Sequence, residues 1–123
     1  MMQHSSEFTN LVEEIRPLIK ETNVEEVKKR LDKKEQFVLI DVREDHEWQI
    51  GHIPTAIHMS RGIIERDIEK TIPNKDESLV LYCGGGFRSA LSAYNLQKMG
   101  YTNVLSMDGG IKDWITSGFG LDE

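Results

Sequence analysis

Residues 79–100, LVLYCGGGFRSALSAYNLQKMG, have the pattern of a buried strand followed by a glycine-rich turn and a helix. The consecutive apolar residues Leu79–Tyr82 suit a strand that is covered on both faces of a sheet. We predict a helix over residues 88–99, with Lys98 in its last turn and Gly100 where a C-terminal cap belongs. A strand that leads through a short turn into a helix is the repeating unit of α/β domains.

Similar patterns occur on both sides of this segment. Residues 37–42, FVLIDV, predict a second buried strand of the same kind. Weaker candidates are strands at 56–59 and 104–107 and helices at 61–70 and 111–117. The alternation predicts an α/β fold with a small, mostly parallel central sheet flanked by helices. In such sheets ligands bind beyond the carboxyl ends of the strands, which here means after Val42 and after Tyr82.

The first part of the chain has a helical pattern of its own. Apolar residues recur at helical spacing over residues 8–20, and Pro17 predicts a kink or a helix end near Arg16. We therefore divide the chain into an N-terminal helical extension, residues 1–21, and a domain that spans residues 22–123. The extension either closes the core of the domain or presents its apolar face to a second copy or a partner protein.

Length and charge narrow the classes of function. The chain has 123 residues and a formal net charge of −6, from 15 Lys and Arg against 21 Asp and Glu. The length supports one domain, and the acidic balance argues against nucleic acid or an anionic membrane surface as a partner. The sequence lacks an apolar run of about 18 residues and a secretory signal pattern, so we expect a cytoplasmic protein.

One cysteine, Cys83, follows the strand at 79–82 and precedes Gly84, Gly85, Gly86, Phe87, Arg88 and Ser89. The glycines allow main-chain N–H groups to turn toward one point, and the helix that follows adds its unpaired N–H groups and the positive end of its dipole. This surrounding favours a thiolate, which is a nucleophile at neutral pH. Arg88 adds a fixed positive charge, and we expect Phe87 to be exposed beside the thiol. An isolated cysteine is more often inert core, but its position at a strand end before this turn favours function.

Further short motifs flank this turn, and they are listed here in chain order: Asp41-Val42-Arg43, Glu47-Trp48, Gly51-His52-Ile53-Pro54, Ala56-Ile57-His58, and Gly109-Gly110-Ile111 with Trp114. In their order and spacing they resemble the rhodanese-like domain family, and the resemblance covers residues 24–118. Thr55 stands where many members have glycine, so we expect a changed local turn without loss of activity. We interpret Asp41 and Arg43 as residues that mainly fix neighbouring loops, since buried charges are normally paired.

The resemblance implies a sulfurtransferase of the thiosulfate type. In that family the cysteine matching Cys83 takes the outer sulfur of a small donor anion as a persulfide. Cyanide, a thiol or a sulfur-carrier protein then accepts that sulfur. The backbone N–H groups from Gly84 to Ser89 would stabilise the persulfide, and no metal or organic cofactor is implied.

Alternatives from other classes stay open. The same fold serves as a protein-interaction module, and a reactive thiol can also sense oxidants. Cysteine phosphatases and arsenate reductases are related, but their loops have one more residue than the four between Cys83 and Arg88. The histidines do not complete a metal-ligand pattern in the sequence.

Overall fold

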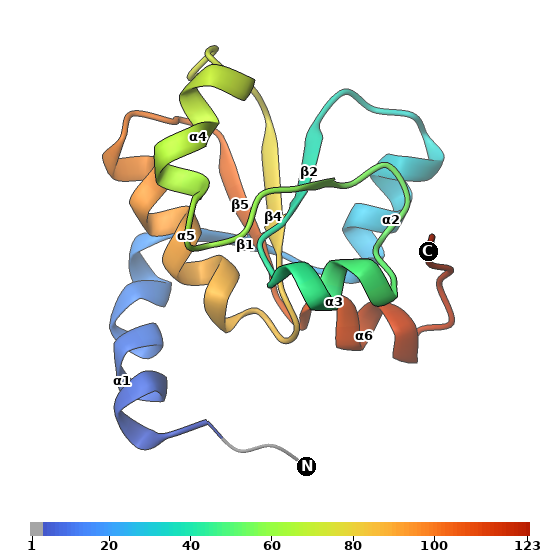
Figure 1. Cartoon of the computed structure of the whole chain (residues 1–123), viewed down its shortest axis with the longest axis horizontal. Helices are drawn as coiled ribbons and strands as arrows, with labels where there is room; N and C mark the ends of the chain where they lie inside the picture. Colours follow the sequence, from blue (N-terminus) through green and yellow to red (C-terminus); the bar gives the residue numbers. More distant parts are fainter. Residues whose placement is uncertain (1–3) are drawn as a thin grey trace.

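A parallel five-stranded sheet forms the centre of the structure, a computed structural model that describes residues 4–123 (Figure 1). The order of strands across the sheet is β1 (Lys20–Thr22), β5 (Val104–Met107), β4 (Leu79–Tyr82), β2 (Val38–Asp41) and β3 (Ile57–His58). Strands β2 and β4 are direct neighbours, with Asp41 opposite Tyr82. The residues after Val42 and after Tyr82 therefore lie side by side at the carboxyl edge of the sheet. The predicted α/β fold is confirmed.

Helices cover both faces of the sheet, and β4 shows how the sequence achieves this. Leu79 and Leu81 lie in one core cluster with residues of α4 (Ile64–Thr71) and α5 (Phe87–Lys98). Val80 and Tyr82 lie in a second cluster with residues of α2 (Val24–Asp32) and α6 (Gly110–Thr116). Because side chains alternate along a strand, a continuous apolar run fills both layers at once.

The predicted elements are present, with shifts of a few residues at their ends. The stretch expected as a helix from residue 61 begins at Ile64, and a short helix, α3 (Asp45–Ile50), contains Glu47 and Trp48. Strand β1 was not predicted, because its sequence Lys-Glu-Thr has no apolar pattern. Thr55 has a φ of 72°, the left-handed conformation that favours glycine. Along residues 4–123 the helices are all too short or too polar to cross a membrane.

The N-terminal segment packs against α5 of the same chain. Helix α1 (Ser6–Ile15) is capped by Ser5 and is followed by the 3₁₀ turn η1 (Arg16–Leu18), which contains Pro17. Val12 is fully buried in a small cluster with Ala90 and Leu91 of α5.

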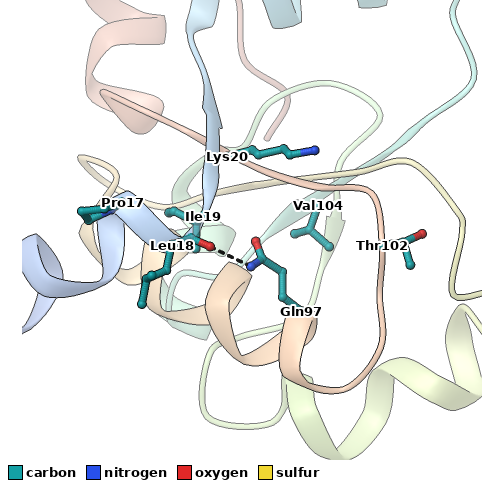
Figure 2. Close-up of a pocket in the computed structure, with 7 residues that line it drawn as sticks. All are labelled: Pro17, Leu18, Ile19, Lys20, Gln97, Thr102 and Val104. Atoms are coloured by element: carbon teal, nitrogen blue, oxygen red, sulfur yellow. Dashed lines mark hydrogen bonds between the residues drawn. The ribbon is translucent and has the colours of Figure 1, made fainter.

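One more hydrogen bond anchors the chain at the end of η1. The Gln97 side-chain amide donates a 2.9 Å hydrogen bond to the Leu18 carbonyl at the edge of a cavity of about 500 Å³ (Figure 2). The N-terminal helix thus packs on α5 through a small apolar cluster that is separate from the two clusters of the sheet layers.

Candidate active site

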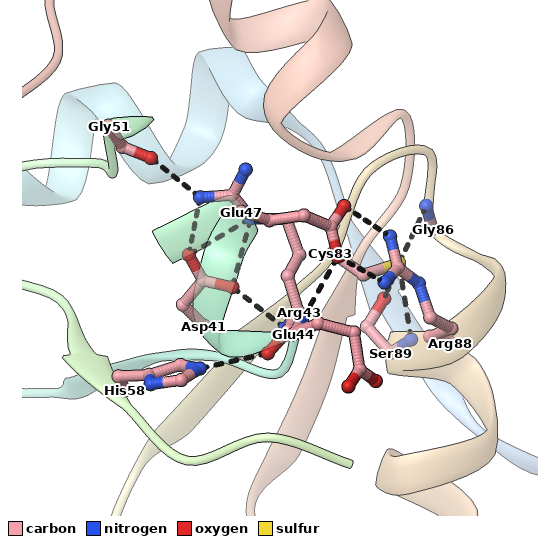
Figure 3. A network of polar contacts seen from close by, with 10 residues as sticks. All are labelled: Asp41, Arg43, Glu44, Glu47, Gly51, His58, Cys83, Gly86, Arg88 and Ser89. Atoms are coloured by element: carbon pink, nitrogen blue, oxygen red, sulfur yellow. Dashed lines mark hydrogen bonds and ion pairs between the residues drawn. The ribbon is translucent and has the colours of Figure 1, made fainter. Parts of the chain in front are cut away.

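Cys83 follows the central strand β4 and lies at the floor of a cavity of about 870 Å³. Its side chain is buried, and its sulfur accepts hydrogen bonds from the main-chain N–H groups of Gly86 at 3.2 Å and Ser89 at 3.3 Å (Figure 3). The Ser89 hydroxyl lies 3.6 Å from the same sulfur and 2.8 Å from the Ser106 hydroxyl. The sulfur is therefore surrounded by polar groups at the N-terminus of α5, where the helix dipole favours negative charge.

The glycine loop is held by the start of α6. The Cys83 and Gly84 carbonyls accept hydrogen bonds from the N–H groups of Ile111 at 2.9 Å and Lys112 at 3.1 Å. In a trans peptide the carbonyl and the following N–H point in opposite directions, so the N–H groups of Gly84 and Gly85 face away from α6. Close approach is possible because Gly110 lacks a side chain. A Cβ on Gly110 would lie 2.5 Å from both carbonyl oxygens.

Arg88 was expected to add a fixed positive charge to the loop, and in the structure this charge is paired with a carboxylate. Its guanidinium donates two hydrogen bonds to the Glu47 carboxylate of α3, at 2.7 and 3.1 Å (Figure 3). These bonds outweigh the opposing effect of burial and lower the pKa of Glu47 to about 2, well below its usual value. The same guanidinium lies over the loop, since a Cβ on Gly84 would come within 3.1 Å of its Nη2. Arg88 therefore connects the loop to α3 as one half of an ion pair.

Asp41 and Arg43 form a second ion pair beside the loop. Asp41 is fully buried and Arg43 is 7% exposed, and the guanidinium Nη2 lies 2.8 Å from the carboxylate. Arg43 also donates to the Gly51 carbonyl at 2.7 Å, and His58 Nε2 donates to the Arg43 carbonyl. Burial disfavours the guanidinium charge, but Asp41 outweighs this effect and raises the pKa of Arg43. The pair joins β2 to the loops after it, and Arg43 also lines the cavity.

Phe87 is less exposed than expected. Its ring is half-buried under the N-terminal segment, 5.8 Å from the ring of Phe8 and 4.3 Å from that of His4. All three side chains line the cavity above Cys83. Neither this contact nor the Glu47–Arg88 pair was predicted, because each joins residues that are far apart in the sequence and carry no shared pattern.

His52 and His58 pack against Trp48 of α3. Trp48 stacks on His52 with 3.6 Å between ring centroids and on His58 with 5.0 Å. Within residues 4–123, His, Cys, Asp and Glu side chains do not gather in a group of three or more that could hold a metal ion. The sequence-predicted residues that come together are therefore Cys83, the loop through Ser89, and the Asp41–Arg43 pair beside it.

The structure is thus an α/β protein with a buried cysteine directly after its central parallel strand, whose sulfur accepts hydrogen bonds from main-chain N–H groups. Residues 23–117 match the sequence model of the family described as Rhodanese-like domain. The chain belongs to this family.

Individual relatives agree with this assignment. The chain is 35% identical over 96 residues to a putative sulfurtransferase, YtwF, of Bacillus subtilis (strain 168), covering 78% of this chain and 90% of that protein. It is 30% identical over 112 residues to the putative sulfur carrier protein YrkF of the same organism, covering 91% of this chain but only 56% of that protein. A solved structure from Rhodopseudomonas palustris, described as a possible tyrosine phosphatase, superimposes with a TM-score of 0.86 at 26% identity and covers 99% of each chain. At the level of the family, the function is sulfur transfer of the rhodanese type.

Proposed function

We propose that this protein is a sulfurtransferase that carries a sulfane sulfur as a persulfide on Cys83. The observation that supports this most is the position of the sulfur, which accepts hydrogen bonds from the Gly86 and Ser89 N–H groups at the start of α5. Such fixed dipoles stabilise a thiolate before the reaction and an anionic adduct after it. A sulfur-based anion is therefore the intermediate that the site suits.

In the first half-reaction the Cys83 thiolate attacks the outer sulfur of a donor such as thiosulfate. A new sulfur–sulfur bond forms at Cys83, the donor's sulfur–sulfur bond breaks, and its electron pair leaves with sulfite. The added sulfur extends into the cavity, beside the loop whose N–H groups at Gly84 and Gly85 face away from α6. These donors would hold the outer sulfur of the persulfide in place.

In the second half-reaction a nucleophilic acceptor attacks the outer sulfur of the persulfide. Cyanide serves as an acceptor in an assay, and a thiol or a sulfur-carrier protein serves in cells. The bond to Cys83 breaks, the electron pair returns to Cys83 as the thiolate, and the site is ready for another donor. The reaction needs no cofactor, and the Glu47–Arg88 and Asp41–Arg43 pairs keep the loops in place through both halves.

The test is intact mass spectrometry after brief exposure to thiosulfate, beside a Cys83→Ser variant. We expect a gain of one sulfur atom that is absent in the variant and is removed by cyanide or a thiol. Since Cys83 is the chain's single cysteine, the variant has no other thiol to modify. No gain of sulfur from thiosulfate or from polysulfides would overturn the proposal and bring the protein-interaction and redox-sensing alternatives forward.

A phosphatase is the second candidate, because the Rhodopseudomonas palustris relative is described as a possible tyrosine phosphatase. Two features of this site argue against it. Arg88, the residue that would face a phosphate, is held by both oxygens of Glu47. The loop also has four residues between Cys83 and Arg88, one fewer than the related phosphatases and arsenate reductases. Release of phosphate from a phosphotyrosine peptide, lost in Cys83→Ser, would favour this candidate.

A further inference from the structure

The N-terminal helix contributes directly to the cavity above Cys83, although it lies outside the residues that match the family. Phe8 of α1 and His4 just before it line the cavity together with Phe87 of the loop. The rings of His4 and Phe8 are 5.1 Å apart, and each lies against the ring of Phe87. The result is one continuous aromatic wall, defined here as His4, Phe8 and Phe87.

Contacts of Arg16 and Val12 hold this aromatic wall in place. The Arg16 guanidinium lies 5.4 Å from the centre of the Phe87 ring and 3.6 Å from the Asp108 carboxylate. Val12, one turn along α1 from Phe8, is fully buried against α5. A wall held in this way loses little freedom when a ligand packs on it, which favours binding.

The charges around the cavity balance. Its lining cations are Arg43, Arg88 and Lys112. Asp41 pairs with Arg43, Glu47 pairs with Arg88, and the lining residue Asp113 adjoins Lys112 in the chain. Counting histidines as neutral, these six groups sum to zero, and the proposed Cys83 thiolate adds one negative charge. A small dianion therefore gains no net attraction from the charged side chains at the cavity.

The size of the cavity also favours a ligand larger than a small inorganic anion. At about 870 Å³ it lies at the upper end of the range of roughly 300–1,000 Å³ that is typical of sites for organic ligands. A small inorganic anion would fill a minor part of it and would leave the aromatic wall without a contact. A sulfur compound with a flat apolar body would reach Cys83 and the aromatic wall together.

We propose that the aromatic wall makes this protein selective for organic sulfur donors that carry an apolar ring. The inference rests on the proposed persulfide chemistry and names the donor class for it. With a thiosulfonate donor, the Cys83 thiolate attacks the outer sulfur, the sulfur–sulfur bond breaks, and the sulfinate leaves with the electron pair. The ring of the leaving sulfinate is the part that contacts Phe8.

The test compares benzenethiosulfonate with methanethiosulfonate, two donors with the same reacting group, using cyanide as the acceptor. The readout is the ratio of their kcat/KM values, which cancels general losses of activity. We expect Phe8→Ala to lower the ratio of the phenyl to the methyl donor by about fivefold, because it removes an aromatic contact. The matched control is Leu11→Ala, on the same helix but 47% exposed and outside the cavity, which leaves the ratio unchanged.

A second variant protects the test against a folding defect. His4 precedes α1, so His4→Ala alters the aromatic wall without removing a helix residue, and it should lower the ratio in the same direction. An unchanged ratio in both variants, or an equal fall in Leu11→Ala, overturns the inference while the sulfurtransferase proposal stands. Transfer from neither thiosulfonate, with sulfur still gained from thiosulfate, overturns the inference alone. If thiosulfate and polysulfides also give no sulfur, the proposed function fails as well.

Discussion

Both arginines that line the cavity are bound to carboxylates, and this determines what they can do. A guanidinium with two hydrogen bonds to one carboxylate has its charge balanced by that carboxylate, which weakens its attraction for a substrate anion. The groups that remain for the reacting sulfur are main-chain N–H donors, whose charge is partial and whose direction is fixed by the loop. At the scale of residues, the charged side chains and the main-chain groups of the site therefore have different roles. Arg88 and Arg43 hold the loops, and the peptide groups face the sulfur.

The Glu47–Arg88 pair makes stability depend on pH in acid. Arg88 hydrogen bonding lowers the pKa of Glu47 from 4.5 to about 2. A lowered folded-state pKa adds stability that is present above pH 4.5 and is lost as pH falls toward 2. Because Glu47 is 28% exposed, we expect Glu47→Gln to cost about 1–2 kcal/mol of unfolding free energy at pH 7.

Urea unfolding of the wild type and Glu47→Gln between pH 7 and pH 2 measures this effect. The two free energies should converge as the pH approaches 2, where the carboxyl group becomes neutral. Glu69→Gln is the control, since Glu69 forms an exposed pair with Lys75 and should cost less than about 0.5 kcal/mol. A difference between wild type and Glu47→Gln that stays constant over this pH range would contradict the assigned role of the pair.

At the scale of elements, the loop after β4 is shaped by its contact with α6. The start of α6 binds the carbonyls of Cys83 and Gly84, and this contact requires a glycine at its first residue. Gly110 has a φ of 60°, so an added side chain meets both backbone strain and a clash. We expect Gly110→Ala to cost about 2–4 kcal/mol of unfolding free energy and to slow persulfide formation strongly.

Gly118→Ala is the matched control for this prediction. Gly118 also has a positive φ, 82°, but a Cβ there would have no atom within 4 Å. It should therefore show the backbone strain alone, about 1 kcal/mol, with an unchanged rate of sulfur gain by mass spectrometry. If both variants lose the same stability and Gly110→Ala keeps its rate, α6 does not set the geometry of the loop.

Sequence patterns predict structure formed by neighbouring residues, but not contacts between residues that are far apart in the chain. Periodicity and turn chemistry predicted β4, α5 and the position of Cys83, because those signals lie within about 20 neighbouring residues. The ion pair from Glu47 to Arg88 spans 41 positions, and the sequence has no pattern that links Glu47 to the loop that contains Arg88. Strand β1 lacks its own signal because it is a short edge strand whose pairing is supplied by β5. The aromatic wall was missed for the same reason, since only the fold brings α1 to Phe87.

At the scale of the whole molecule, the chain consists of a sheet with two cores and a helix attached from outside. Strand β4 is paired on both sides and buried on both faces, whereas α1 contacts the rest of the chain mainly through α5. Opening α1 exposes little besides Val12, Phe8 and the surface beneath them. Local opening should therefore need less free energy at α1 than at the sheet.

Native-state hydrogen exchange tests this arrangement. Amides of β4 should exchange only through global unfolding, and amides of α1 through a local opening of lower free energy. Val12→Ala removes two buried methyl groups from the contact with α5, so it should accelerate exchange in α1 by about tenfold while β4 follows global stability. Because α1 also holds Phe87, the same opening would remove one side of the cavity above Cys83. Equal protection of α1 and β4 in the wild type would instead mean that the helix and the sheet unfold as one unit.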